Sequence, residues 1–322
     1  MMRVAILDDY QGVALGLADW SSLHPRAQIQ AFADHVDDLD TLAKRLHVFD
    51  AIVLMRERTP FPRALFEKLP NLRLLITAGM RNASIDLAAA TDATERCVQV
   101  CGTDMLPYPT AELAWGLILA LLRHIPREDR ATREGRWQTT LGLGAKGKTL
   151  GLLGLGRLGG QVAKIGAAFG MAPIAWSQNL TGARAAEVGA QLVTKEELFA
   201  RADILSVHLV LSPRSKGLVG APELARMKPT AFLVNTSRGP IVDEAALVAA
   251  LEEKRIAGAA IDVFDPEPIA KGHPLLGLGN TVITPHLGYV TEENYRLLYG
   301  QAVEDITAFL DGKVLRAMNE VA

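Results

Sequence analysis

Three segments in the C-terminal half of the chain end an apolar run with side chains that could carry out chemistry. The segments VNTSRGPIVDE, IDVFDPEP and TPHLG contain Arg238, Glu267 and His286, respectively. An imidazole, with an unperturbed pKa of about 6.5, exchanges protons near neutral pH, and a paired carboxylate favours its protonated form and fixes its tautomer. A guanidinium holds a carboxylate in a two-point contact that Lys does not reproduce. We therefore expect these residues to act on a small organic acid.

Each of these residues also has an ordinary structural interpretation. His286 could be a hydrogen-bonded loop residue, Arg238 could cap a helix or meet Asp243, and Glu267 could be a solvated turn residue. Ligands of open α/β sheets bind beyond the carboxyl ends of the strands, where all three segments fall. Their joint occurrence with a cofactor motif favours a shared site over three separate structural roles.

That motif is the segment TLGLLGLGRLGGQVA at residues 149–163, which places glycines at Gly154, Gly156 and Gly159. In a dinucleotide-binding turn the first glycine permits the tight bend and the second lets a pyrophosphate approach the backbone. The third lets the following helix pack on the strand, with its N-terminus facing the phosphates. An apolar strand at 150–153 and a helix-compatible segment at 161–169 supply the context that the motif requires.

Composition restricts the class of protein further. The 322 residues suit two domains, and a net charge of −2 with scattered Lys and Arg gives no sign of a nucleic-acid or membrane partner, so a small molecule is expected. Cys97 and Cys101 have neither the number nor the spacing for a disulfide framework or a zinc site, so we expect two small buried residues and no metal. The N-terminus reads as a strand without a secretory signal, which predicts a cytoplasmic protein.

Short apolar runs alternate with helix-length amphipathic segments, a pattern typical of parallel sheets. Helices are expected at 39–46, 62–68 and 292–310, and the run at 113–122 is too short to cross a bilayer and predicts a buried helix. The predicted strands fall at residues 4–7, 51–55, 72–76, 174–176, 204–207, 231–234, 259–263 and 282–284.

The predicted fold is α/β, with two Rossmann- or flavodoxin-like, doubly wound lobes of parallel sheet and a cleft between them. Because about 150 residues precede the glycines, the first domain is expected to be discontinuous. We assign residues 1–101 and 288–322 to a substrate domain and 102–287 to a dinucleotide-binding domain. The two crossings would act as hinges.

The sequence resembles the D-isomer-specific 2-hydroxyacid dehydrogenase family. The resemblance rests on GLLGLGRLGGQVA, MKPTAFLVNTSRGPIVDEAAL, GAAIDVFDPEPI and NTVITPHLGYVT, and more weakly on LRLLITAGMRNASID and TAELAWGLILALLR. It implies that Arg238 binds substrate, that Glu267 and His286 form the acid/base pair, and that Asp262 lies beside the nicotinamide. It also implies that the loop 78–82 presents backbone groups to the substrate carboxylate, and that the protein is a homodimer formed through the cofactor domain.

Two departures from the family pattern affect these predictions. Ser177 stands where the family often has an Asp that accepts the ribose hydroxyls, and no Asp or Glu occurs from 160 to 184. Ser177, Gln178 and Asn179, assisted by Arg184 or Lys195, could hydrogen-bond a ribose or a phosphate, so the cofactor is NAD or NADP. In the substrate loop, AGMRNASID replaces a more glycine-rich pattern, and Arg81 could alter substrate choice.

The segment MRERTPF carries Arg56 and Arg58 after a predicted strand. Either could bind a second anionic group, although ordinary exposed arginines are the favoured interpretation. The predicted cofactor-binding residues are Gly154, Gly156, Arg157, Leu158, Gly159, Ser177, Gln178, His208, Thr236, Asp262 and Gly288. The predicted substrate-binding residues are Arg56, Ala78, Gly79, Met80, Arg238 and His286.

The predicted function is an NAD(P)-dependent interconversion of a D-2-hydroxyacid and its 2-oxoacid by hydride transfer. Two alternatives stay open: a non-catalytic, NAD(H)-sensing protein related to transcriptional corepressors, and a dehydrogenase of formate or phosphite. Because the stretch after His286 is short, we expect no C-terminal regulatory domain of the kind that some phosphoglycerate enzymes carry.

Overall fold

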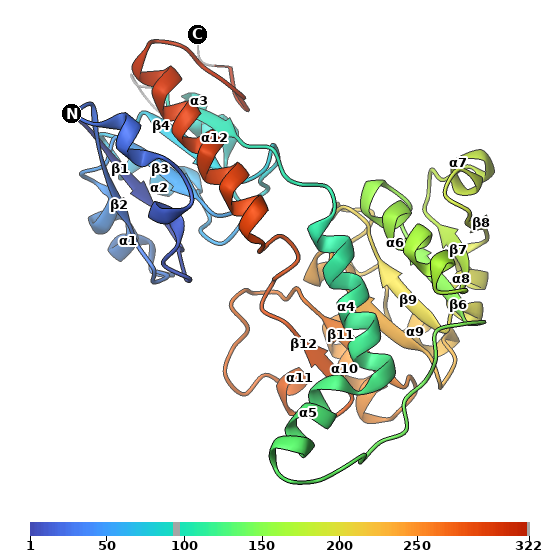
Figure 1. Cartoon of the computed structure of the whole chain (residues 1–322). Coiled ribbons are helices and arrows are strands. Elements are labelled where there is room, and N and C mark those ends of the chain that lie inside the picture. The colour runs from blue at the N-terminus through green and yellow to red at the C-terminus, as the bar shows by residue number, and fades with distance from the viewer. Residues whose placement is uncertain (93–96, 321–322) are drawn as a thin grey trace. The chain divides into compact units, whose positions relative to one another are not determined.

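The computed structural model describes residues 1–92 and 97–320 and divides the chain into two compact units (Figure 1). Unit 1 comprises Met1–Leu106 and Thr291–Ala322, and unit 2 comprises Pro107–Val290. The first unit is thus built from both ends of the chain. The boundaries expected from the sequence, after residues 101 and 287, fall a few residues before those of the units.

Unit 1 contains a five-stranded parallel sheet in the order β2-β1-β3-β4-β5. This is the flavodoxin-like order of a doubly wound sheet. Its strands are β1 (Met2–Ile6), β2 (Ala27–Ala31), β3 (Ala51–Leu54), β4 (Leu74–Thr77) and β5 (Gln99–Gly102). Its helices are α1 (Leu39–Leu46), α2 (Arg63–Glu67), α3 (Leu87–Asp92) and α12 (Glu292–Leu310), with 3-10 turns at Ala14–Gly16 and Trp20–Leu23.

Unit 2 contains a seven-stranded parallel sheet in the order β12-β11-β10-β9-β6-β7-β8. The order reverses between β6 and β9, which makes their carboxyl ends the expected ligand site of a Rossmann-like sheet. Its strands are β6 (Thr149–Leu153), β7 (Ala172–Trp176), β8 (Gln191–Leu192), β9 (Ile204–Val207), β10 (Phe232–Asn235), β11 (Gly258–Ile261) and β12 (Thr281–Ile283). Its helices are α4 (Pro109–Arg123), α5 (Ile125–Arg133), α6 (Arg157–Ala168), α7 (Gly182–Ala186), α8 (Lys195–Arg201), α9 (Ala221–Arg226), α10 (Glu244–Glu252) and α11 (Pro274–Gly277), with a 3-10 turn at Gly239–Ile241.

The sheet of unit 2 is buried on both faces. Successive strand side chains point to opposite faces, so Leu152 and Val234 belong to one hydrophobic cluster and Leu153 and Leu233 to another. The first cluster includes apolar residues of α4 and α6, and the second includes those of α8, α9 and α10. This two-sided burial explains why the strands read as continuous apolar runs.

The helix predicted at 113–122 is the core of α4. Trp115 on this helix stacks on Phe169 with ring centroids 4.8 Å apart, and its indole nitrogen donates to the Val162 carbonyl at 3.2 Å. These contacts fix α4 against α6, the helix that follows the glycine motif. Among the described residues, no helix is both long and apolar enough to cross a membrane.

Three strands and one cysteine differ from the predictions. The apolar runs do not predict β2, β5 or β8. Two of these strands lack an apolar run, since β2 carries polar side chains at alternate positions and β8 has just two residues, both exposed. Cys101 lies buried on β5, but Cys97 is exposed, because it stands before that strand begins.

Candidate active site

The segments with Arg238 and His286 follow β10 and β12, and the segment with Glu267 follows β11, which lies between them. The parallel register pairs Asn235 with Ile261 and Ile261 with Ile283. The three strands therefore end at the same edge of the sheet, and the polar segments that leave them are neighbours. The arrangement that the sequence predicts from three distant segments is present within unit 2.

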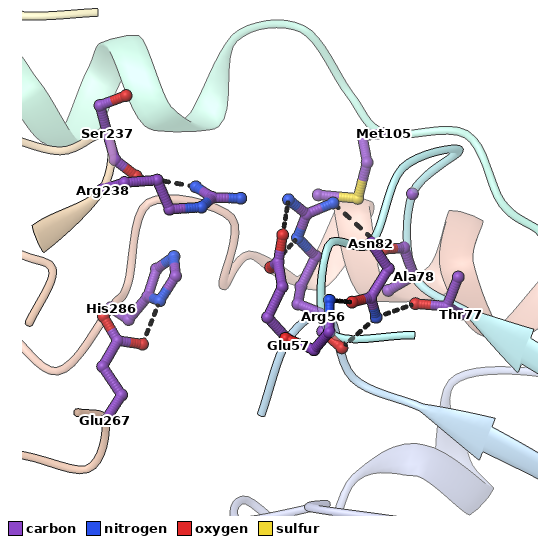
Figure 2. A network of polar contacts seen from close by, with 12 residues as sticks. Arg56, Glu57, Thr77, Ala78, Asn82, Met105, Ser237, Arg238, Glu267 and His286 are labelled. Carbon is purple, nitrogen blue, oxygen red and sulfur yellow. Dashed lines mark hydrogen bonds and ion pairs between the residues drawn. The ribbon is translucent and has the colours of Figure 1, made fainter. Parts of the chain in front are cut away.

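His286 and Glu267 are in direct contact. The imidazole Nδ1 lies 2.6 Å from the Glu267 Oε2, and the other carboxylate oxygen accepts a hydrogen bond of 2.8 Å from the Phe264 amide (Figure 2). The Tyr289 ring packs edge-on against the imidazole, with centroids 5.2 Å apart. Among the described residues, no partner hydrogen-bonds the Nε2 of His286. The carboxylate thus orients the ring and leaves its second nitrogen available for a proton transfer.

Asp262 shapes the loop that carries His286. Its fully buried carboxylate accepts hydrogen bonds from the Thr284 hydroxyl at 2.6 Å, the Leu287 amide at 2.7 Å and the Gly288 amide at 2.9 Å. Burial raises the pKa of Asp262, while these hydrogen bonds oppose the rise. Since His286 has a left-handed backbone (φ 53°), the contacts on both sides of it hold a conformation that few residues adopt freely.

Arg238 lies on a turn fixed by main-chain contacts. The Asn235 side chain donates to the Arg238 carbonyl at 3.0 Å and accepts from the Ser237 amide at 3.0 Å. A Cβ atom on Gly239 would lie 2.5 Å from the backbone carbon of Phe264, so this glycine lets the turn after β10 approach the turn that carries Glu267. Figure 2 draws the Arg238 guanidinium above the imidazole of His286, and both residues belong to unit 2.

The glycine turn fits a dinucleotide. Gly154 has φ +101°, and a Cβ there would lie 2.6 Å from the His208 carbonyl oxygen, while a Cβ on Gly159 would collide with the Gly154 carbonyl. Gly156 differs, because a Cβ there would meet no atom of a described residue within 4 Å. The helix α6 begins at Arg157 directly after Gly156, and no side chain in the described ranges caps it. The protein itself therefore explains two of the glycines, and a bound pyrophosphate would explain the third.

Two further residues predicted to bind the cofactor lie near this turn or beyond β10. His208 follows β9, is partly buried and lies 2.9 Å from the Ser206 hydroxyl through its Nε2; the loss of hydration lowers its pKa to about 4. Thr236 follows β10, and its buried hydroxyl makes no hydrogen bond with a described residue. An unpaired buried hydroxyl beyond a strand end fits a site that takes up a polar ligand.

At the end of β7, Arg214, which the sequence did not single out, lies beside the predicted cofactor-binding residue Gln178. Ser177 is half-buried and Gln178 is exposed, and the Gln178 side chain accepts a hydrogen bond of 3.4 Å from Arg214. The cations proposed from the sequence are engaged elsewhere. Arg184 is ion-paired with Glu187, and Lys195 donates to Glu223 at 2.8 Å. Arg214 stands 36 positions after Gln178, so short-range spacing could not reveal it.

In unit 1, Arg56 follows β3 and contacts the loop after β4. Its guanidinium donates to the Ala78 carbonyl at 3.1 Å and lies 3.5 Å from the Glu57 carboxylate. Gly79 (φ +90°) has no Cβ to collide with that guanidinium. The Asn82 side chain donates to the Arg56 carbonyl at 2.7 Å and completes the network in Figure 2.

The interpretation of the two arginines as ordinary exposed residues is wrong. Arg56 and Arg58 are both partly buried, and Arg58 donates to the Asp8 carbonyl at 2.7 Å while lying 4.4 Å above the Tyr10 ring. Both guanidinium groups bind main-chain oxygens of their own unit. Arg81 and Met80, by contrast, are exposed.

Two amides of the loop after β4, which the resemblance implies for binding the substrate carboxylate, already donate hydrogen bonds within unit 1. The Ala78 amide donates to the Leu54 carbonyl at 3.1 Å, and the Gly79 amide donates to the Thr103 hydroxyl at 3.1 Å. Within the described ranges 1–92 and 97–320, no acceptor takes the Met80 amide. In the same ranges, no three or more His, Cys, Asp or Glu residues form a group that could hold a metal ion.

A doubly wound sheet with this glycine turn and an Arg, Glu and His at its carboxyl edge defines a nicotinamide-dependent oxidoreductase. Residues 115–288 match the family model described as D-isomer specific 2-hydroxyacid dehydrogenase, NAD binding domain. The chain belongs to the family of D-isomer specific 2-hydroxyacid dehydrogenases.

Three relatives illustrate this membership. A glyoxylate reductase of Aeropyrum pernix is 39% identical, over 85% of this chain and 84% of its own. A D-3-phosphoglycerate dehydrogenase of Bacillus subtilis is 37% identical over 85% of this chain, which spans about half of that longer protein (52%). The crystal structure of a putative D-3-phosphoglycerate dehydrogenase from Ralstonia solanacearum superposes with a TM-score of 0.93 and 37% identity, over 99% of this chain and 97% of the other.

Proposed function

We propose that the protein reduces a small 2-oxoacid to the D-2-hydroxyacid, and catalyses the reverse reaction, with a nicotinamide dinucleotide as the hydride carrier. The observation that carries this proposal is the 2.6 Å contact between His286 and Glu267 at the sheet edge that also carries Arg238. A nucleotide sensor that performs no chemistry needs no such acid/base pair, and formate has no hydroxyl proton to exchange.

The proposed roles follow from the geometry of unit 2. When bound, the nicotinamide supplies or accepts the hydride. His286 donates a proton to the substrate oxygen from Nε2 during reduction and removes it during oxidation, because Nδ1 is held by Glu267. Arg238 binds the substrate carboxylate, and Asp262 positions the His286 loop. The pyrophosphate binds at Gly156 and the N-terminus of α6. The rest of the cofactor site is lined by Thr236, His208, Leu158 and Gly288.

The contacts in unit 1 favour a small substrate with a single negative charge. Met80 is the proposed amide donor to a substrate oxygen, since the amides of Ala78 and Gly79 bond within the unit. The Glu57 carboxylate beside Arg56 offsets its charge, which disfavours a second anionic group on the substrate. We therefore favour a short, singly charged 2-oxoacid such as glyoxylate over a phosphorylated one.

A substrate panel tests the function. Oxidation of NADH and NADPH should be followed with glyoxylate, hydroxypyruvate, pyruvate, 2-oxoglutarate and phenylpyruvate. We expect the highest kcat/KM with glyoxylate or hydroxypyruvate and weak use of 2-oxoglutarate. Arg238→Lys should raise the KM for the oxoacid more than the Kd of the cofactor, because Lys keeps the charge and loses the two-point contact. Cofactor binding without turnover of any 2-oxoacid would contradict the proposal and favour the sensor.

The assembly is a separate part of the proposal. The segment after α5 exposes large apolar side chains, with Trp137 77% and Leu141 93% exposed. Exposed apolar side chains of this size favour a protein–protein interface, and we propose a homodimer formed through unit 2. We also propose that the protein is cytoplasmic. Light scattering should give twice the 34.7 kDa chain mass, and Leu141→Asp should shift the species toward the monomer.

A further inference from the structure

We propose that Arg214, together with Ser177 and Gln178, forms a binding site for the 2′-phosphate of NADP(H), and that the protein prefers this cofactor to NAD(H). The inference rests on the proposed function and adds the choice between the two nicotinamide cofactors.

The site lies where a Rossmann-like sheet reads the adenosine ribose. Ser177 follows β7, whose last residue accepts a hydrogen bond of 2.9 Å from the Gly154 amide of the glycine turn. A carboxylate at this strand end accepts the ribose hydroxyls of NAD and repels a 2′-phosphate. This chain has a serine there and no Asp or Glu from 160 to 184. The repulsion is therefore absent, and a hydroxyl donor stands in its place.

Arg214 supplies a positive charge at this strand end. The loop after β9 presents it on a turn in which the Ser212 amide donates to the Ser215 hydroxyl at 2.8 Å, and that hydroxyl donates to the Val210 carbonyl at 2.7 Å. The guanidinium reaches the Gln178 side chain at 3.4 Å. It is exposed and forms no ion pair with any carboxylate of the described residues. Within the described part of the chain, its guanidinium therefore has no carboxylate partner that a phosphate would have to displace.

The other cations near β7 are less suited to this role. Arg184 is ion-paired with Glu187 on its own helix, α7. Lys195 is ion-paired with Glu223. Each would have to leave a carboxylate before it could bind a phosphate, whereas Arg214 would exchange a long hydrogen bond to a neutral amide for one to an anion.

Binding of two fragments tests the inference without turnover. Adenosine 2′,5′-bisphosphate and adenosine 5′-monophosphate differ by the 2′-phosphate alone, and calorimetry gives a Kd for each with the full-length protein. We expect the bisphosphate to bind at least about tenfold more tightly, because a hydrogen bond to a charged group contributes a tenfold to hundredfold change in affinity. The preference should shrink as salt is raised.

Three variants separate the contributions. Arg214→Ala should reduce the preference for the bisphosphate about tenfold or more, whereas the control Arg184→Ala should keep it, since Arg184 is paired with Glu187. Ser177→Asp should reverse the preference by adding the repelling carboxylate.

Two results would overturn the inference. One is an equal affinity of the wild type for both fragments, and the other is a preference for the bisphosphate that Arg214→Ala leaves intact. Either result is distinct from a failure of the proposed function, which would appear as the absence of 2-oxoacid turnover with both NADH and NADPH.

Discussion

At the carboxyl edge of the sheet in unit 1, two arginine side chains donate hydrogen bonds to main-chain carbonyls of the same unit. Arg56 donates to the Ala78 carbonyl, Arg58 donates to the Asp8 carbonyl, and Gly79 leaves room for the Arg56 guanidinium. The corresponding edge of unit 2 is arranged differently. There His286 keeps its Nε2 clear of the described residues, and Gly156 borders open space.

The difference separates two uses of similar residues. The groups in unit 1 determine the shape of a loop, so changing them should affect stability and substrate affinity. In unit 2, no described residue hydrogen-bonds the Nε2 of His286 or lies within 4 Å of a Cβ at Gly156, so changing these two residues should affect turnover or cofactor affinity and leave folding nearly intact. Substitutions at matched positions can contradict this comparison or make it quantitative.

The largest effect is expected at His286. His286→Gln should lower kcat by roughly 10³-fold, because general acid–base catalysis contributes about 10²–10⁴-fold. The Kd for the reduced cofactor, measured by fluorescence titration, should change little. Glu267→Gln should lower kcat less, by about 10–100-fold, since the ring loses its orienting carboxylate but keeps its nitrogen atoms.

Arg56→Met provides the contrast for His286. It removes the donor to the partly buried Ala78 carbonyl and should destabilise the protein by about 1–2 kcal/mol. Its main kinetic effect should be a higher KM for the oxoacid. A loss of kcat comparable to that of His286→Gln, without a loss of stability, would place Arg56 among the reacting groups and contradict the comparison.

Two glycine substitutions give the next effect. Gly79→Ala places a Cβ against the Arg56 guanidinium at a positive φ and should destabilise the protein by about 2–4 kcal/mol in urea unfolding. Gly156→Ala places its methyl more than 4 Å from every atom of the described residues and should leave the stability of the free protein nearly unchanged. It should weaken cofactor binding by about tenfold or more, because the added methyl occupies the approach of the pyrophosphate. Equal destabilisation by the two substitutions would show that Gly156 has a structural role instead.

The sequence predicts most of what lies along the strands. Residues at strand ends can be grouped without coordinates, since apolar runs identify parallel strands and their carboxyl ends share an edge. For this reason Arg238, Glu267 and His286 could be proposed together, and the contact between Glu267 and His286 is present in unit 2. The family membership and the two-lobed α/β fold are confirmed by the matched family model and by the solved relatives.

What the sequence misses depends on the paths of loops. Arg214 reaches Gln178 through a loop whose course no periodicity reports. The partners of Arg56 and Arg58 are carbonyl oxygens, which every residue has, so residue types cannot identify them. The same is true of the Ala78 and Gly79 amides, whose acceptors become visible only when β3 and β5 are placed beside β4.

The smallest predicted effect is at His208. This residue is an exception to the comparison, because it lies in unit 2 and yet changing it should affect stability. Burial lowers its pKa to about 4 in the folded protein, below the value of about 6.5 expected when unfolded. The unfolded chain therefore binds more protons between these values, and stability falls as the pH falls from about 6.5 toward 4. At pH 5.5 the loss attributable to this residue should be about 1 kcal/mol relative to pH 7.5.

Urea unfolding at the two pH values, followed by tryptophan fluorescence, measures this loss, since three of the four tryptophans lie in unit 2. His208→Gln should remove the acid-dependent part, and His47→Gln, at an exposed histidine of unit 1, should retain it. If both variants lose stability on acidification as the wild type does, His208 is not kept neutral by burial. Its contacts with the cofactor turn would then come from its carbonyl beside Gly154 and its Cβ beside Gly159, and its ring would contribute no pH dependence.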